Sequence, residues 1–95
     1  IKGRAGGKVF DFDDVDVAII GRAKTAGIVL DHSSVSREHA EVIDVGGDLL
    51  IEDLHSANGT RVNGERITRQ ILRDGDEIGI GPFLLRFEDR GAYRL

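Results

Sequence analysis

The sequence contains no cysteine, which excludes a disulfide, a thiol nucleophile and a cysteine-based metal site. It also lacks methionine, and because residue 1 is Ile we expect residues 1–95 to be a single domain cut from a longer polypeptide. Long hydrophobic runs are missing, since the runs at 17–20 and 49–51 are far too short to cross a bilayer, and no segment resembles a signal or transit peptide. We therefore expect a cytoplasmic, intracellular domain without membrane insertion.

An excess of positive charge is missing as well. Thirteen Lys and Arg residues against 17 Asp and Glu residues give a net charge of −4. Proteins that bind DNA or RNA through generic electrostatics usually carry a basic excess, so the composition argues against a nucleic acid partner. A domain with a net negative charge can still hold one anion in a local basic pocket.

The residues that could ligate a metal do not have the spacing of a metal site. Aspartates crowd residues 13–16, but this segment lacks the glycine and the distal Glu of an EF-hand loop, so we predict a solvated turn. His32, His39 and His55 are spaced in a way that fits no zinc signature. We expect no metal and no cofactor.

Glycine is abundant, with 13 residues against one proline, which favours short strands joined by tight turns. The Asn63-Gly64 pair is the strongest hairpin signal, because both turn residues must tolerate positive φ. Residues 34–39 are compatible with one helical turn capped by Ser36. Otherwise the pattern predicts an all-β sandwich or barrel. The predicted strands are residues 8–12, 17–20, 28–30, 39–45, 49–54, 60–62, 65–67, 77–81 and 83–88.

Polar residues and glycines mark the ends of several predicted strands. Taken singly, each has an ordinary role: an arginine at a strand end forms a surface ion pair, a serine caps a turn, and a histidine that opens an apolar strand stays neutral and hydrogen-bonded. Their order along the chain is more informative than any one of them. That order is Gly21-Arg22, Ser36-x-x-His39, Asn58-Gly59, Asn63-Gly64 and Gly75-Asp76.

In this order and spacing, residues 9–87 resemble the forkhead-associated (FHA) domain, a module that binds phosphothreonine. The resemblance implies an FHA-type (SMAD/FHA-like) eleven-stranded β-sandwich with the binding loops at one end. It also implies the partner, a phosphothreonine-containing protein or peptide that an upstream Ser/Thr kinase has phosphorylated. This phosphosite belongs either to another protein, to which the domain recruits its parent, or to the parent chain itself.

The resemblance further implies a role for each position. Arg22 and Ser36 donate hydrogen bonds to the phosphate, and Arg37 adds charge there or holds the ligand backbone. Asn58 bonds the peptide main chain beside the phosphothreonine. A guanidinium suits this task because its fork of donors matches phosphate geometry. The positions that shape or brace the loops are Gly21, His39 and Gly59.

Two positions depart from the family pattern. The family often has Asn-Asp where this chain has Ala26-Gly27, and many members have Thr or Ser where this chain has Ala57. We expect that Ser56 supplies the missing phosphate bond or that the bond is absent. Ligand selectivity beyond the phosphothreonine is expected from loop side chains, for which the candidates are Lys24, Thr25, Arg61 and Arg66.

Two alternative functions stay open. The first keeps the fold but docks partners through a sheet face without phosphate, and Ala57 favours it. The second is an enzyme with Ser36, His39 and Asp53 as a hydrolase triad. The chain has no nucleophile elbow G-x-S-x-G and no Walker-type loop, so we expect a binding module and no enzymatic activity.

Overall fold

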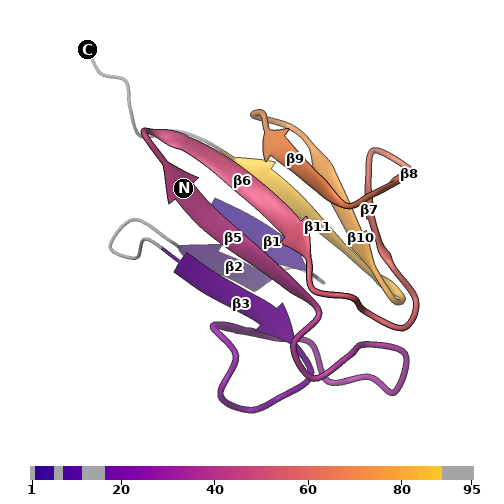
Figure 1. The fold of residues 1–95 in the computed structure, drawn as a ribbon. Coiled ribbons are helices and arrows are strands. Elements are labelled where there is room, and N and C mark those ends of the chain that lie inside the picture. The colour runs from indigo at the N-terminus through magenta and orange to yellow at the C-terminus, as the bar shows by residue number, and fades with distance from the viewer. Residues whose placement is uncertain (1, 6–7, 12–16, 89–95) are drawn as a thin grey trace.

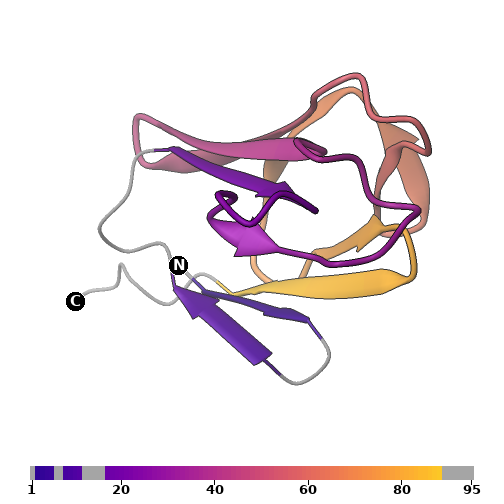
Figure 2. The same cartoon turned by 90° about the horizontal axis from the view of Figure 1, so that it is seen from below.

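The structure, a computed structural model, describes residues 2–5, 8–11 and 17–88, so the acidic turn expected at 13–16 lies outside the described residues. The described residues form eleven strands and no helix, arranged as two sheets that pack face to face (Figures 1 and 2). The all-β, eleven-stranded sandwich expected from the sequence is therefore confirmed.

The six-stranded sheet is antiparallel. It brings the first and the last described strands together, because β1 pairs with β11. In spatial order its strands are β2 (Lys8–Asp11), β1 (Lys2–Ala5), β11 (Phe83–Glu88), β10 (Glu77–Ile80), β7 (Thr60–Val62) and β8 (Glu65–Ile67).

The five-stranded sheet contains the strands that carry most of the predicted site. Only its β3–β4 pair is parallel, with Ile20 opposite Ile28. The parallel pairing requires the chain to cross back after β3, and this crossover creates the loop that begins at Arg22. In spatial order its strands are β4 (Ile28–Val29), β3 (Val17–Gly21), β5 (Ala40–Val45), β6 (Asp48–Asp53) and β9 (Arg69–Leu72).

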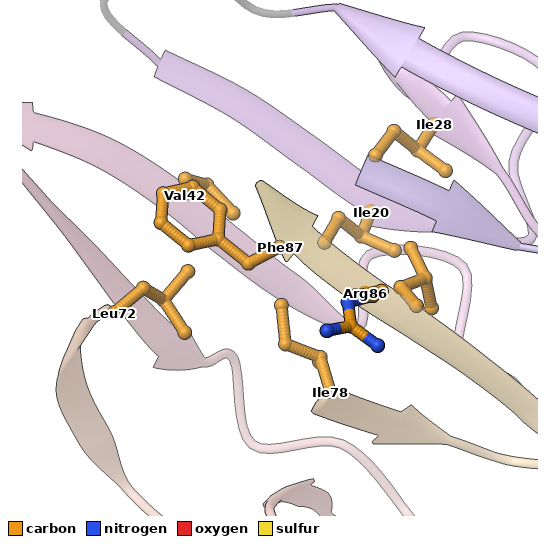
Figure 3. A pocket seen from close by; sticks show the side chains of 8 residues that line it. Ile20, Ile28, Val42, Leu72, Ile78, Arg86 and Phe87 are labelled. Atoms are coloured by element: carbon orange, nitrogen blue, oxygen red, sulfur yellow. The ribbon is translucent and has the colours of Figure 1, made fainter. Parts of the chain in front are cut away.

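The core lies between the sheets and is built from the inward-facing half of each alternating strand. Figure 3 shows Ile20 and Val42 of the five-stranded sheet near Ile78 and Phe87 of the six-stranded sheet, around an apolar space of about 10 Å³. A space of that size holds one water at most, and water needs polar partners that aliphatic side chains do not offer. The space is therefore a packing defect and no ligand site.

The outer face of the five-stranded sheet carries an unusual row of apolar side chains. Val17, Ile43, Leu50 and Ile71 lie directly opposite one another on four adjacent strands. Their neighbours along each strand point into the core, so these four point outward. Val17 is 49% exposed and Ile71 37%, whereas Leu50 in the middle is 9% exposed. We call these four residues the apolar row.

The sequence predictions for individual elements have mixed outcomes. The Asn63-Gly64 turn is confirmed, with φ of 52° and 86°. Strands β1 and β9 were not predicted. The helical turn at 34–39 was wrong: the chain forms a turn closed by the Val35 N–H bond to the carbonyl of His32, and the Ser36 hydroxyl bonds another loop instead of capping its own.

Loops from both sheets meet at one end of the sandwich, at the lower end of Figure 1. The chain after β3 bonds the β4–β5 loop, since Arg22 N donates to the Ser36 carbonyl at 3.0 Å. The β6–β7 loop joins them through Asn58 Nδ2, which donates to the Ser34 carbonyl at 2.9 Å. The β10–β11 turn packs on the same loop, because a Cβ added at Gly81 would lie 2.7 Å from Ser34 Oγ. This end holds the candidate site.

Candidate functional site

Arg22 follows the last residue of β3 and is anchored to the neighbouring loop by two bonds. Its backbone N–H donates to the Ser36 carbonyl, and its Nε–H donates to the Val35 carbonyl, both at 3.0 Å. The side chain is half-buried. Its two terminal nitrogens make no hydrogen bond to the described residues, so their four N–H donors remain available to a ligand.

Gly21 permits the close approach that joins Arg22 to this loop. A Cβ added at Gly21 would lie 2.1 Å from the carbonyl oxygen of Arg37 and 2.8 Å from its carbonyl carbon. Both atoms are backbone and cannot rotate away, so any side chain here would push the Ser36-Arg37 segment outward. Ala23 N also donates to the Arg37 carbonyl at 3.2 Å, which fixes the backbone of Arg37.

The Ser36 hydroxyl connects two loops. Its oxygen accepts a hydrogen bond from the backbone N–H of Ala57 at 3.0 Å, across 21 residues of sequence. A hydroxyl has one hydrogen to donate in addition to its acceptor lone pairs. The described residues give that hydrogen no acceptor, so the Ser36 O–H remains a free donor held at a defined position.

His39 is fully buried, and both of its ring nitrogens are used by the backbone. Nδ1 accepts from the N–H of Ser36 at 3.0 Å, and Nε2 lies 2.8 Å from the carbonyl of Gly59, to which it donates. An accepting Nδ1 and a donating Nε2 define a neutral imidazole with its proton on Nε2. His39 thus connects the Ser36 loop to the Asn58-Gly59 loop.

The Asn58-Gly59 pair lies at the rim of the site. Asn58 is exposed, and after its bond to the Ser34 carbonyl it keeps its Oδ1 acceptor and one Nδ2 hydrogen. These two groups match the N–H and C=O that a peptide main chain offers. Gly59 adopts φ of +85°, a conformation that glycine reaches without a steric cost.

Ser56 is engaged inside its own loop. Its hydroxyl donates to Asp53 Oδ1 at 2.5 Å and accepts from the N–H of Gly59 at 2.9 Å. Its only hydroxyl hydrogen is therefore used by the carboxylate. These two bonds brace the loop, and the neighbouring Ala57 has no side-chain donor.

Asp53 collects the donors of this loop. It accepts from the Ser56 hydroxyl and backbone N–H and, at 2.7 Å, from the hydroxyl of the buried Thr60. Burial by itself would raise the pKa of Asp53, but the hydrogen bonds from Ser56 and Thr60 favour the carboxylate more strongly and hold the pKa below its ordinary value. The carboxylate is part of the loop scaffold.

The remaining cationic candidates surround these loops. Arg37 and Lys24 are exposed and make no hydrogen bond or ion pair through their side chains to the described residues, and Thr25 is exposed beside Lys24. Arg66 lies against Gly59, whereas Arg61 extends away over the β10–β11 turn and donates to the Gly81 carbonyl at 3.4 Å. The loops of this end therefore carry the cationic side chains of Arg22, Lys24 and Arg37 in a domain of net charge −4.

The enzyme alternative loses its geometric basis here. Ser36 meets His39 through its backbone N–H and not through its hydroxyl, so the imidazole cannot take the hydroxyl proton. Asp53 bonds Ser56 and Thr60 in place of the imidazole. A triad needs both missing contacts. In the part of the chain that the structure describes, no group of three or more His, Cys, Asp or Glu residues is arranged to hold a metal ion.

The free Arg22 donors, the Ser36 O–H and the nearby Arg37 charge suit a small oxyanion beside a peptide backbone. Comparison with known proteins decides the family, because the FHA domain model matches residues 18–81. The chain belongs to the FHA family. FHA domains are phosphopeptide-binding modules, and the chain is one of them.

Curated relatives extend well beyond this FHA domain. The chain is 45% identical over 67 residues to the glycogen accumulation regulator GarA of Mycolicibacterium smegmatis. The matched region is 70% of this chain and 42% of GarA. It is 48% identical over 62 residues to the transcriptional regulatory protein EmbR of Mycobacterium tuberculosis, and this match includes 64% of the chain and 16% of EmbR. The chain thus spans less than half of these relatives.

Solved structures agree with the sequence comparison. The FHA domain of the CT664 protein from Chlamydia trachomatis superposes with a TM-score of 0.86 at 32% identity, covering 95% of this chain and 97% of that one. Mycobacterium tuberculosis EmbR in complex with a low affinity phosphopeptide gives 0.87 at 33% identity, covering 98% of this chain and 26% of EmbR. None of the described residues forms a helix that could span a membrane.

Proposed function

We propose that this FHA domain binds a phosphothreonine peptide by holding the phosphate between the terminal nitrogens of Arg22 and the hydroxyl of Ser36. One observation carries the proposal: both donors are fixed by backbone groups of the loops at one end, yet keep hydrogens to donate. Arg37 adds charge from the same loop, and Asn58 bonds the peptide main chain. Gly21, His39 and Gly59 hold these loops together.

Electrostatics supports this assignment. A phosphothreonine carries about −1.5 to −2 charges at neutral pH, with three strong acceptor oxygens. Charge-assisted hydrogen bonds contribute roughly 1.5–3 kcal/mol each, and two or three of them must also offset the ordering of a flexible peptide. We therefore expect a dissociation constant of micromolar order, about −8 kcal/mol.

Few side chains are proposed to donate hydrogen bonds to the phosphate. Ala57 has no hydroxyl, its backbone N–H is occupied by Ser36, and Ser56 gives its proton to Asp53. We assign Ser56 to loop support, so no serine or threonine at the β6–β7 loop contributes a second hydroxyl. The low affinity phosphopeptide bound to EmbR, whose structure this chain resembles, is consistent with a modest interaction.

A domain that binds phosphothreonine would act within a Ser/Thr kinase pathway. It would recruit its parent protein to a target phosphorylated by a Ser/Thr kinase, or bind a phosphosite in its own parent chain. It would act inside the cell, where such kinases have ATP, and would catalyse no reaction itself. The absence of contacts from the Ser36 hydroxyl to His39 supports a binding role over catalysis.

Calorimetric titration of matched threonine and phosphothreonine peptide libraries tests the proposal. Wild-type domain should bind only phosphorylated peptides, and Arg22→Ala should weaken binding at least tenfold, since it removes charge-assisted bonds of about 1.5–3 kcal/mol each. Arg73→Gln, in the β9–β10 turn at the opposite end, removes the same charge and should bind like wild type. Binding that is unaffected by Arg22→Ala would exclude the proposal.

The apolar row favours a second candidate function, phosphate-independent docking through the outer face of the five-stranded sheet. Beside the row, Glu41, Glu52 and Arg69 lie opposite one another on three adjacent strands, so Arg69 is a cation next to the two glutamates. A partner segment with apolar side chains would cover the row. Ile43→Asp should abolish such docking and leave phosphopeptide affinity unchanged; docking that survives Ile43→Asp would exclude this candidate.

A further inference from the structure

The exposed side chain of His32 closes a turn in the β4–β5 loop. Its Nδ1 lies 3.1 Å from the backbone nitrogen of Ser34 and 2.8 Å from the Ser34 hydroxyl oxygen. A backbone N–H can only donate, so Nδ1 is the acceptor and the imidazole is neutral, with its proton on Nε2. The backbone closes the same turn, because Val35 N donates to the His32 carbonyl at 3.0 Å. We call residues 32–35 the anchor turn.

The anchor turn packs against the β10–β11 turn. The imidazole of His32 meets the ring of Phe83 edge-on, with centroids 6.3 Å apart and an interplanar angle of 87°. Gly81 lies against Ser34, because a Cβ added at Gly81 would be 2.7 Å from Ser34 Oγ. Gly81 also has φ of 56°, so both its backbone conformation and this close approach favour glycine. Ser34 is therefore held between the imidazole and the β10–β11 turn.

The anchor turn supplies the carbonyls that fix two of the proposed ligand-binding side chains. The Ser34 carbonyl accepts a hydrogen bond from Asn58 Nδ2 at 2.9 Å, and the Val35 carbonyl accepts one from Arg22 Nε at 3.0 Å. Ser36, whose hydroxyl is proposed to bond the phosphate, follows directly in the chain. A change in the anchor turn would thus displace the acceptors of Asn58 and Arg22 together.

We propose that His32 is a positioning residue for phosphopeptide binding: neutral His32 holds the anchor turn in the form that fixes Asn58 and Arg22, and protonated His32 releases it. The inference rests on the proposed function, because it acts through these two side chains. An imidazolium carries a hydrogen on both nitrogens and therefore offers the Ser34 N–H no acceptor. The Ser34 hydroxyl can rotate and accept from the imidazolium, but the backbone N–H cannot.

Charged groups reach the anchor turn and its neighbours from several elements. Asp31 precedes the turn on the same loop, Arg22 bonds the turn from the chain after β3, and Arg61 donates to the β10–β11 turn on which His32 packs. The β6–β7 loop meets the anchor turn through the uncharged Asn58. Histidine changes charge between about pH 5 and 8, whereas aspartate and arginine ordinarily keep their charges there. The predicted release therefore depends on His32.

Fluorescence anisotropy with one phosphothreonine peptide at about pH 7.5 and about pH 5.5 tests the inference. The phosphate also gains a proton over this range, since its second pKa is about 6, so each variant is compared with wild-type domain at the same pH. His32→Ala removes the acceptor and should weaken binding about threefold at the higher pH, as expected for the loss of one neutral hydrogen bond.

Two further variants separate the acceptor from its titration. His32→Asn offers Oδ1 as an acceptor but cannot be protonated, so it should bind like wild-type domain at the higher pH and about threefold tighter than wild-type domain at the lower pH. His55→Asn removes another exposed histidine and is the matched control, which should keep the wild-type pH profile.

A double-mutant cycle tests whether His32 acts through Asn58. In the Asn58→Ala background His32→Ala should cost less affinity than in wild-type domain, because one of the anchored side chains is already missing. Thermal melts verify that each variant is folded. Wild-type affinity in His32→Ala, a wild-type pH profile in His32→Asn, or fully additive losses in the cycle would overturn the inference alone. Failure of wild-type domain to bind the phosphopeptide would instead overturn the proposed function and the inference with it.

Discussion

The hydroxyl oxygen of Ser36 accepts a hydrogen bond from the backbone N–H of Ala57, 3.0 Å away on a different loop. This contact positions the hydroxyl, and its hydrogen has no acceptor among the described residues. It also explains how a chain with alanine at position 57 can still present a donor at the loop end. At position 57 the β6–β7 loop contributes a backbone N–H that positions Ser36, in place of a side-chain hydroxyl.

Ser36→Ala should lower phosphopeptide affinity about tenfold, because one hydrogen bond to a charged group contributes roughly 1.5–3 kcal/mol. It should also cost about 1 kcal/mol of unfolding free energy, since the N–H of Ala57 loses its acceptor. Titration calorimetry and urea unfolding measure the two effects. Ser36→Thr keeps the hydroxyl and is the matched control; if alanine and threonine bind equally well, Ser36 makes no phosphate contact.

His39→Ala should destabilise the domain by at least about 3 kcal/mol, because it leaves the Ser36 N–H and the Gly59 carbonyl unpaired beside a cavity. Chemical denaturation measures the loss. The control is His55→Asn: His55 is exposed at φ of 56°, a conformation that Asn tolerates, so its stability should stay within about 0.5 kcal/mol. Equal effects of the two changes would contradict the bracing role of His39.

Gly21→Ala should destabilise the domain and weaken phosphopeptide binding together, because the new Cβ would collide with the Arg37 carbonyl 2.1 Å away. Overpacking against backbone typically costs about 1–3 kcal/mol, and relief of the clash moves the segment that carries Ser36. At Gly27 an added Cβ would make only ordinary contacts, at 3.4 Å from Ala18, so Gly27→Ala is the control. Wild-type stability and binding in Gly21→Ala would disprove the close approach.

Asp53 makes the domain sensitive to acid. Because hydrogen bonds from Ser56 and Thr60 hold its pKa below the ordinary 3.8, the stability contributed by ionised Asp53 is complete above pH 3.8 and is lost as the pH falls through the lower folded-state value. Thr60→Val removes one of these bonds and raises the folded-state pKa toward the ordinary value. The variant should therefore lose less unfolding free energy than wild type on acidification, as measured by urea unfolding across pH 2–6; an equal loss would contradict the assignment.

Much of the fold could be predicted because turns depend on local chemistry. Asn63-Gly64 needs two positive φ values, and few other residue pairs supply them. Strand β1 (Lys2–Ala5) has almost no β-forming side chains, and β9 (Arg69–Leu72) is an edge strand with only Leu72 buried. Both strands form because neighbouring strands offer pairing partners, which a local pattern does not reveal.

The sequence could name the loop residues of the candidate site, but it could not give their hydrogen-bond partners. Ser56 stands three residues after Asp53, a spacing that favours a local carboxylate–hydroxyl bond, and in the structure this bond uses the hydroxyl hydrogen of Ser56. The position of Arg66 depends on the register of β7 and β8 and on its contact with Gly59. Cross-strand register is a tertiary property, so sequence could name Arg66 as a selectivity candidate but could not locate it.

The central claim is that one phosphate occupies the space between Arg22 and Ser36, and an NMR titration with isotope-labelled domain tests it most directly. On addition of a phosphothreonine peptide, the side-chain N–H signals of Arg22 and the amide signals of Ser36 and Ala57 should shift, and the unphosphorylated peptide should leave them unchanged. Shifts confined to Ile43 and Leu50 on the outer face of the five-stranded sheet, with Arg22 and Ser36 unmoved, would contradict the claim.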